Sequence, residues 1–210
     1  MDVSERERLE QQIRERFDAG DLHGAATLGI RGYGPEIFGV LVSLQRDESL
    51  AHEAFSAFAE RLWRGLPAFE WQCSFRTWAY TIARNASRNL ADATRVRKRV
   101  TPLPSDSELE AVAAEVRSTT QSFLKSRVKD GLAKLREALP SDDQLLLVLR
   151  FDKEMSWNEI ARVMSTAEAA LDAATEKREA ARLRQRGQTL KRELLAKAKA
   201  AGLVGDGSNR

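Results

Sequence analysis

Apolar residues recur along most of the chain at spacings of three and four, which is the period of an α-helix. In the first half, this spacing predicts helices over residues 4–18, 35–44, 49–66 and 77–97. The GYGP sequence is expected to separate the first two of these, with Pro35 opening the second. Alternating patterns long enough for strands are absent from the sequence. The pattern therefore predicts an all-α protein.

A change of composition divides the chain. Residues 101–124 begin with two prolines and turn acidic with little bulk, which is typical of a flexible linker, although helix is expected to start near Ser107. We expect two small helical domains, residues 1–100 and 125–202, and a flexible tail over residues 203–210.

The second domain contains a pattern typical of a helix-turn-helix. Leu145 to Leu149 is apolar on all sides, so it is expected to be a short buried helix. Ser156 and Glu159 have the spacing of a capping box, which predicts a helix start at that point. A long basic helix is expected to follow, which completes a helix-turn-helix arrangement.

Composition excludes several classes of protein. Of 210 residues, only Cys73 is a cysteine and only two are histidines, so an internal disulfide is excluded and a structural metal site is not expected. No apolar run approaches the ~20 residues that cross a bilayer. Phosphate loops, GxSxG and HExxH motifs are absent, so we expect neither an enzyme nor a cofactor. The prediction is a soluble cytoplasmic protein.

Charge is distributed unevenly along the chain. The net charge is +3, yet residues 76–99 carry seven basic residues and one acid, and residues 176–199 carry nine basic residues and three acids. Each block is therefore +6, and the rest of the chain is −9. Two basic blocks on an acidic chain indicate two contacts with one polyanion, and the alternative is two solvated helix faces.

Aromatic residues surround the first basic block. Phe69, Trp71 and Phe75 precede Arg76 and further arginines, and such mixtures bind single-stranded nucleic acid because bases stack on rings while phosphates meet cations. The alternative is that the aromatic residues form the core. Helical spacing favours the core for Trp78, whereas the polar surroundings of Trp71 favour contact with a base.

The second basic block lies in the last expected helix. Arginine can donate two hydrogen bonds to a guanine edge or a phosphate, whereas lysine acts mainly as a point charge on phosphate. An exposed helix balanced by Glu176 and Glu179 is the alternative. The candidate DNA-binding residues of this helix are Lys177, Arg178, Arg182, Arg184 and Arg186.

Three stretches resemble the extracytoplasmic-function sigma factors of bacterial RNA polymerase. SFRTWAYTIARN (residues 74–85) is similar to the family's second conserved region, which melts the promoter, and FAERLWRGLPAFEW (residues 58–71) is similar to the segment before it. LPSDDQLLLVLRFDKEMSWNEIARVM (residues 139–164) resembles the start of the fourth region, which carries a helix-turn-helix. The order of the stretches is that of the family.

This resemblance implies a role for each part of the chain. The protein would bind the clamp and flap of core RNA polymerase and direct it to promoter DNA, and an anti-sigma factor is a possible further partner. The loop from Phe69 to Phe75 would hold an unstacked base, and Ser156 and Trp157 would place a helix start at a phosphate. The remaining implied DNA-binding residues are Arg76, Arg84, Asn85, Arg88 and Asn89, and the implied polymerase-binding residues are Glu53, Phe55, Glu60 and Trp63.

Two other functions are compatible with the same residues. A stand-alone helix-turn-helix regulator would use the second domain in the same way, but it needs a dimer interface, and no heptad pattern predicts one. A sigma mimic that only sequesters an anti-sigma factor would have no need of the two basic blocks. Both blocks favour promoter recognition over the mimic.

Overall fold

The computed structural model describes residues 1–96, 107–127, 135, 138–165 and 171–201. All regular secondary structure in these residues is helical, which confirms the all-α prediction. The chain divides into two compact units, Met1–Leu124 and Lys125–Arg210, and each is considered by itself. The expected tail at residues 203–210 lies outside the described residues.

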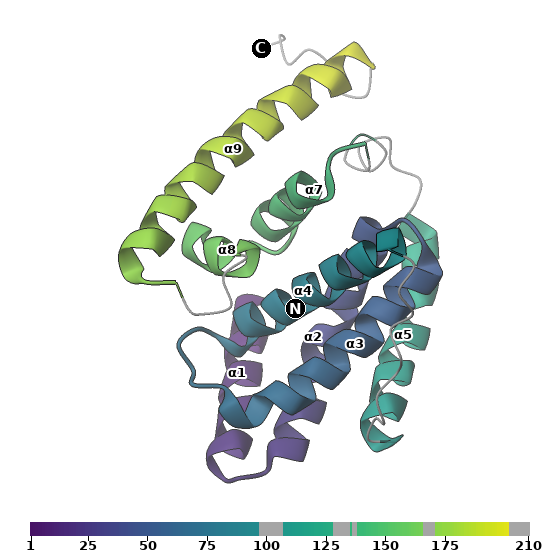
Figure 1. Ribbon diagram of the computed structural model, residues 1–210, viewed down its shortest axis with the longest axis vertical. Coiled ribbons are helices and arrows are strands. Elements are labelled where there is room, and N and C mark those ends of the chain that lie inside the picture. Colours follow the sequence, from purple (N-terminus) through teal and green to yellow (C-terminus); the bar gives the residue numbers. More distant parts are fainter. Residues whose placement is uncertain (97–106, 128–134, 136–137, 166–170, 202–210) are drawn as a thin grey trace. The chain divides into compact units, whose positions relative to one another are not determined.

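Four helices build the core of the first unit: α1 (Val3–Asp18), α2 (Leu22–Gln45), α3 (Glu48–Gly65) and α4 (Phe75–Val96) (Figure 1). The helices expected over residues 4–18, 49–66 and 77–97 are confirmed with ends shifted by at most two residues. Their apolar faces meet in one core. Its largest fully buried side chains include Ile13, Tyr33, Phe38, Phe55, Phe58, Leu62, Phe75 and Tyr80.

The break expected at GYGP does not occur, because α2 runs through Pro35 without ending. Proline costs a helix interior about 3 kcal/mol, since it removes one hydrogen bond and crowds the preceding turn. Burial on both sides of Pro35 outweighs this cost: Tyr33, Ile37 and Phe38 are all fully buried. Tertiary packing therefore overrides the local signal, and the helix expected to begin at Pro35 begins at Leu22 instead.

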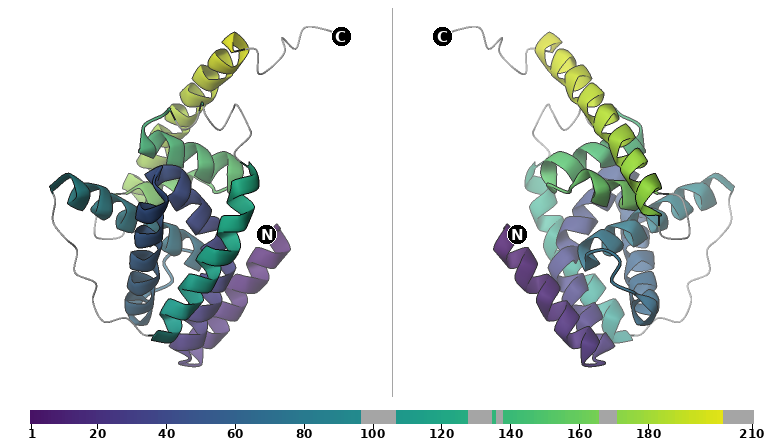
Figure 2. Two further views of the ribbon diagram at one scale, coloured as in Figure 1. Left: turned by 90° about the vertical axis from the view of Figure 1, so that its right-hand side faces the viewer. Right: turned by 90° about the vertical axis from the view of Figure 1, so that its left-hand side faces the viewer.

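A further helix, α5 (Ser107–Arg127), occupies most of the expected linker and runs beside α2 and α3 (Figures 1 and 2). Val112, Ala113 and Val116 are buried. The guanidinium of Arg117 donates to the Ser56 hydroxyl of α3 at 2.7 Å. Residues 107–124 are therefore a packed helix that starts where helix was expected, and residues 101–106 lie outside the described residues.

The second unit contains α7 (Ser141–Leu147), a π-helical turn (Val148–Asp152), α8 (Trp157–Met164) and α9 (Ala173–Ala200). The expected buried run from Leu145 to Leu149 is buried throughout. The capping box is confirmed, because the Ser156 hydroxyl accepts from the Glu159 amide at 3.2 Å and the Glu159 carboxylate accepts from the Ser156 amide at 2.8 Å. The second unit therefore has the helical elements that a helix-turn-helix needs.

Gly187 lets α9 approach α8 closely. A Cβ atom at this position would lie 2.8 Å from the ring carbon Cη2 of Trp157, which is closer than side-chain contacts allow. We predict that Gly187→Ala lowers the free energy of unfolding of the second unit by about 1–3 kcal/mol, because the packed Trp157 ring has to move. Urea denaturation measures the change, and Ala181→Gly on the exposed side of α9 provides a control for altered helix propensity alone.

Candidate nucleic-acid interface

A loop from Phe69 to Ser74 connects the short 3-10 turn Leu66–Ala68 to α4. Phe69 is buried, and its ring stacks on that of Trp78 with centroids 4.5 Å apart. Trp71, two residues later, has a φ of +56°. A bulky side chain in this left-handed region costs of order 1–3 kcal/mol and persists only where the surroundings enforce it. The loop is therefore held in one defined conformation.

The Trp71 ring lies between three side chains. The guanidinium carbon of Arg14 sits 4.5 Å from the ring centroid, in cation–π geometry. The Phe17 ring meets it edge-on at 5.5 Å, and the Phe69 ring lies at 4.8 Å. The indole nitrogen is buried and has no hydrogen-bond partner in the part of the chain that the structure describes. Trp71 therefore keeps part of its aromatic surface exposed, whereas its indole N–H is buried.

Glu10 of α1 binds the start of α4. Its two carboxylate oxygens accept the backbone N–H groups of Phe75 and Arg76, each at 2.8 Å. Its Oε1 atom also accepts the O–H of Tyr33 at 2.8 Å. Burial raises the pKa of the Tyr33 phenol and the nearby Glu10 carboxylate raises it further, so Tyr33 stays protonated as a donor. No local sequence pattern predicts this contact, because Glu10 is separated from Phe75 by 65 positions.

Four of the sequence-predicted DNA-binding residues lie inside the first unit. Phe75 is fully buried, and Phe69, Arg76 and Arg84 are less than a tenth exposed. Arg76 pairs with Glu36 of α2, with Arg76 Nε and Glu36 Oε1 2.9 Å apart. Burial alone would lower the pKa of Arg76, but the hydrogen bond to Glu36 and the negative charge of Glu36 together outweigh it, so the pKa is raised. We therefore leave these four residues out of the DNA-binding surface.

The other predicted residues of α4 face outward. Asn85, Arg88 and Asn89 are exposed along its surface. With its amide oxygen turned toward α3, Asn89 accepts hydrogen bonds from both terminal nitrogens of Arg61, each at 3.1 Å. Arg61 is itself exposed and was missed by the sequence analysis, because it lies on a different helix. Together these four side chains form a polar and basic strip, which we call the α3–α4 strip.

The predicted polymerase-binding residues of α3 do not all reach the surface. Phe55 is fully buried in the core, so it cannot touch a partner directly. The other three predicted residues lie on one side of the helix, because Glu60 follows Glu53 by seven positions and Trp63 follows Glu60 by three. Ser56 falls in the same row, which we call the α3 row, and Arg117 of α5 contacts Ser56.

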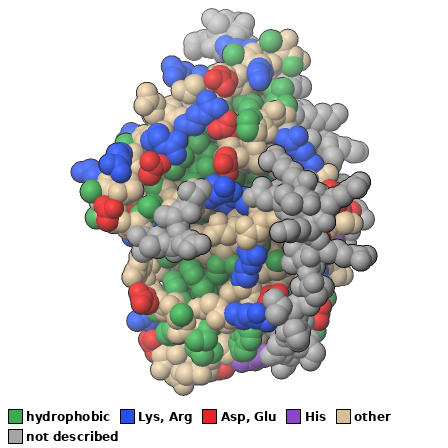
Figure 3. Space-filling model, in the orientation of Figure 1, with side chains coloured by type: hydrophobic (Ala, Val, Ile, Leu, Met, Phe, Trp, Pro, Cys, Tyr) green, Lys and Arg blue, Asp and Glu red, His purple; other side chains and the backbone are tan. Residues whose placement is uncertain are grey.

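The long helix α9 buries one side and exposes the other. Its buried residues from Glu176 to Leu190 lie three and four apart, and Ala198 follows eight residues later; they are Glu176, Ala180, Leu183, Gly187, Leu190 and Ala198. At 100° per residue, the opposite side carries Arg178, Arg182, Gln185, Thr189 and Arg192, which we call the α9 stripe. Arg192 was not among the predicted residues. Figure 3 shows Lys and Arg side chains along the whole of this helix.

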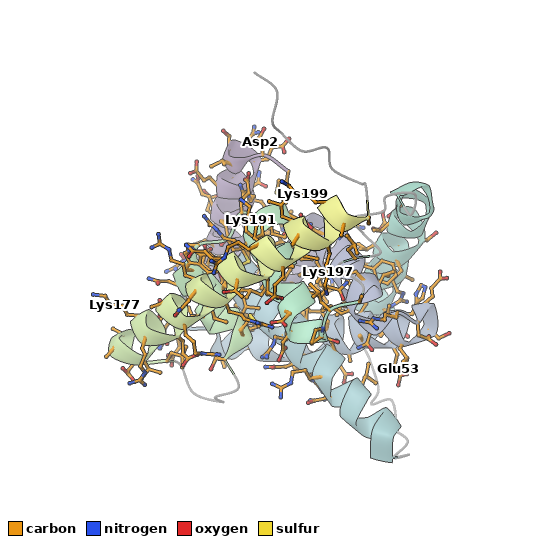
Figure 4. The ribbon with its side chains drawn as sticks, turned by 90° about the horizontal axis from the view of Figure 1, so that it is seen from above. Asp2, Glu53, Lys177, Lys191, Lys197 and Lys199 are labelled. Carbon is orange, nitrogen blue, oxygen red and sulfur yellow. The ribbon has the colours of Figure 1, made fainter. Side chains whose placement is uncertain are left out.

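The other predicted residues of α9 flank this stripe. Lys177 and Arg184 are exposed, and Figure 4 shows Lys177 at one end of α9 and Lys199 at the other. Arg186 reaches α7, where its Nε atom donates to Asp143 at 3.0 Å and the hydrogen bonding raises the pKa of Arg186. Arg182 pairs with Glu179 at 2.8 Å but stays 68% exposed. Arg186 therefore supports the fold, whereas Arg182 remains available.

Ser156 and Trp157 lie at the start of α8. The Ser156 side chain is engaged in the capping box, so it serves the helix itself. The ring of Trp157 lies 5.2 Å from the guanidinium of Arg150 and against Gly187. Both residues therefore stabilise the second unit, and their predicted contact with a phosphate stays a prediction.

Two kinds of site are absent from the residues that the structure describes. Among them, no group of three or more His, Cys, Asp or Glu side chains is arranged to hold a metal ion. None of the helices in these ranges is long and apolar enough to span a membrane. What the described surface offers is basic and aromatic groups on helices.

Comparison with known proteins agrees with this geometry. Residues 30–99, which include α3, the loop and all of α4, match the family described as Sigma-70 region 2. The chain is also 27% identical over 165 residues to the RNA polymerase sigma-H factor of Pseudomonas aeruginosa, covering 74% of this chain and 82% of that protein. Residues 30–99 are therefore similar to sigma-70 region 2, and the chain is similar to a sigma factor over most of its length.

Proposed function

We propose that the protein is a sigma factor of the extracytoplasmic-function type, which binds core RNA polymerase in the cytoplasm and melts a subset of promoters. The observation that carries this proposal is the loop around Trp71, where an aromatic residue in a strained backbone conformation is followed by α4, whose exposed face carries polar and basic side chains. Bases stack on aromatic rings at about 1–3 kcal/mol each. The loop therefore fits a base that has left the duplex.

The α3–α4 strip fits the single strand next to that base. Arg61 and Arg88 offer cations for phosphates, and Asn85 and Asn89 offer amides for base edges. An anionic strand compensates the positive charge of this surface without any covalent chemistry. The proposed mechanism is therefore capture of one melted strand.

Trp71→Ala tests this role. We expect open-complex formation to fall about 5- to 100-fold, which corresponds to the loss of one stacked base at about 1–3 kcal/mol. Closed-complex binding should change less than twofold, because duplex DNA has no unstacked base to offer. Permanganate footprinting measures the first quantity and gel shift the second.

Trp71→Phe is the matched control, because it keeps an aromatic ring and should retain most of the melting activity. Equal losses of closed and open complexes in Trp71→Ala would contradict the proposed role of the loop. A circular-dichroism melt of each variant separates loss of function from loss of fold.

We propose that the α9 stripe reads the upstream promoter element in the major groove. An α-helix fits this groove, and arginine donates two hydrogen bonds to guanine at about 1–3 kcal/mol for each good pair. The stripe combines arginines with Gln185 and Thr189, which are side chains that read base edges.

Arg182→Ala should weaken binding to the upstream element about 5- to 100-fold, since one bidentate contact is worth about 1–3 kcal/mol. Lys197→Ala removes the same charge from the same helix outside the stripe, and should weaken binding by only the general phosphate attraction. Fluorescence anisotropy at two salt concentrations compares the variants. Equal effects of both substitutions would show that α9 binds DNA by charge alone.

We propose that the α3 row binds the polymerase clamp through Glu53, Glu60 and Trp63, and that the second unit binds the flap. Arg117 of α5 contacts Ser56 within this row, and Val116 of α5 lies against Gly34 of α2. A clamp that covers the row therefore has to displace α5. An anti-sigma factor is a further proposed partner, because it would compete for the same row.

A further inference from the structure

One side of α1 contacts the loop and the start of α4. Glu10, Arg14 and Phe17 lie at spacings of four and three, so they share one face of the helix. Ile13, beside them, is fully buried and fixes α1 against the core. Residues 3–18 precede the segment 30–99 that matches the family, so this contact belongs to a different part of the chain.

Glu10 fixes the end of the loop. A helix start leaves backbone N–H groups without partners within the helix, and a negative charge there is favoured by the helix dipole. The Glu10 carboxylate takes two of these N–H groups, on Phe75 and Arg76, immediately after the loop. The start of α4 is therefore occupied by a side chain of the protein, so its distance from α1 is set by two charge-assisted hydrogen bonds.

Arg14 and Phe17 fix the middle of the loop. They contact the Trp71 ring through a cation–π contact at 4.5 Å and an edge contact at 5.5 Å. Trp71 needs these contacts, because its left-handed backbone conformation is energetically costly. The loop is thus held at its end by Glu10 and at its centre by the two other residues of the same face.

We propose that this face of α1 positions the loop for base capture, with Glu10 as a positioning residue and Arg14 and Phe17 as the wall that orients Trp71. This inference rests on the proposed function of the loop. It predicts that the preference of the protein for an intact base at the captured position depends on α1, although α1 itself reads no base. Pre-organisation of the site is the physical reason, since a loop that is already ordered loses less entropy on binding.

The test uses the full chain bound to core polymerase and fork-junction DNA whose non-template strand carries a single abasic site. The measured quantity is the ratio of dissociation constants for abasic and intact DNA at each position. In the unmodified protein we expect a ratio of about ten at the captured base. Glu10→Gln keeps the shape of the side chain but removes the charge, and should reduce this ratio to about two.

Two other measurements must stay unchanged for the inference to hold. Glu10→Gln should bind core polymerase and duplex upstream DNA within twofold of the unmodified protein, which a general loss of structure would not allow. Gln11→Ala, on an exposed part of α1, is the matched control and should keep the ratio near ten. Phe17→Leu tests the same face if Glu10→Gln does not fold.

The outcomes separate the two levels of the proposal. A ratio that stays near ten in both Glu10→Gln and Phe17→Leu would overturn the inference while leaving the function of the loop intact. A ratio near one at every position in the unmodified protein would overturn the proposed base capture, and the inference with it. A reduced ratio in Glu10→Gln and Phe17→Leu, with Gln11→Ala unchanged, supports both.

Discussion

A disulfide between α2 and α5 should abolish binding to core RNA polymerase. The positions are Gly34 and Val116: a Cβ at Gly34 would lie 2.9 Å from Val116 Cγ1, so the two Cβ atoms fall near the ~3.5–4.5 Å that a disulfide spans. The bond would keep α5 on the α3 row, which we propose as the clamp-binding surface. We expect the oxidised Gly34→Cys/Val116→Cys protein to lose at least about 100-fold in affinity.

The same protein in its reduced form is the control. Placing both substitutions in a Cys73→Ser background prevents alternative pairing. Reduction should restore binding to within a few-fold of the Cys73→Ser parent, as measured by co-sedimentation or biolayer interferometry with core polymerase. Equal affinity of the oxidised and reduced forms would show that the clamp does not need the surface under α5.

Removing Glu36 should destabilise the first unit by about 3–5 kcal/mol, the typical cost of leaving one charge of a buried pair behind. The side chains of Arg76 and Glu36 are only 8% and 17% exposed, so water cannot replace the lost carboxylate. Urea unfolding of Glu36→Ala measures the loss. Asp18→Ala removes the partner of the exposed Arg14 and should cost at most about 1 kcal/mol.

A double variant makes this prediction specific. Glu36→Met/Arg76→Met replaces both charges by apolar groups of similar length, and should recover most of the stability lost in Glu36→Ala. If the double variant is as unstable as Glu36→Ala, then packing around Glu36 and not the unpaired charge accounts for the loss.

Much of the first unit was predictable because apolar residues recur every three or four positions in its helices. Residues that break helices, such as Pro67, mark where some of them end. The limits of α3 follow from its amphipathic pattern and from Pro67 after it. The helix break expected at Pro35 was wrong, because buried residues on both sides of this proline stabilise the helix. That burial follows from contacts between helices and is not visible in the local sequence. α5 was read as a linker because two prolines precede it, although Leu109, Val112, Ala113 and Val116 have helical spacing.

The site was predicted less completely than the fold. Residue type and spacing identified Trp71, Arg88 and Arg182, all of which keep exposed surface. The same reasoning could not tell that Arg76 turns inward, because its partner Glu36 lies 40 residues away. Glu10 and Arg61 were missed for the same reason, since their roles depend on contacts between helices that no short motif contains.

Run-off transcription with purified core RNA polymerase on a library of genomic fragments tests the central claim most directly. The account predicts that the full chain, added to core polymerase, starts transcripts at a defined subset of fragments that core polymerase alone does not use. It also predicts that Trp71→Ala suppresses these transcripts, and that pre-melting the promoter DNA restores them. Transcripts that do not depend on the added protein, or specific binding to promoter DNA at full affinity without polymerase, would contradict it.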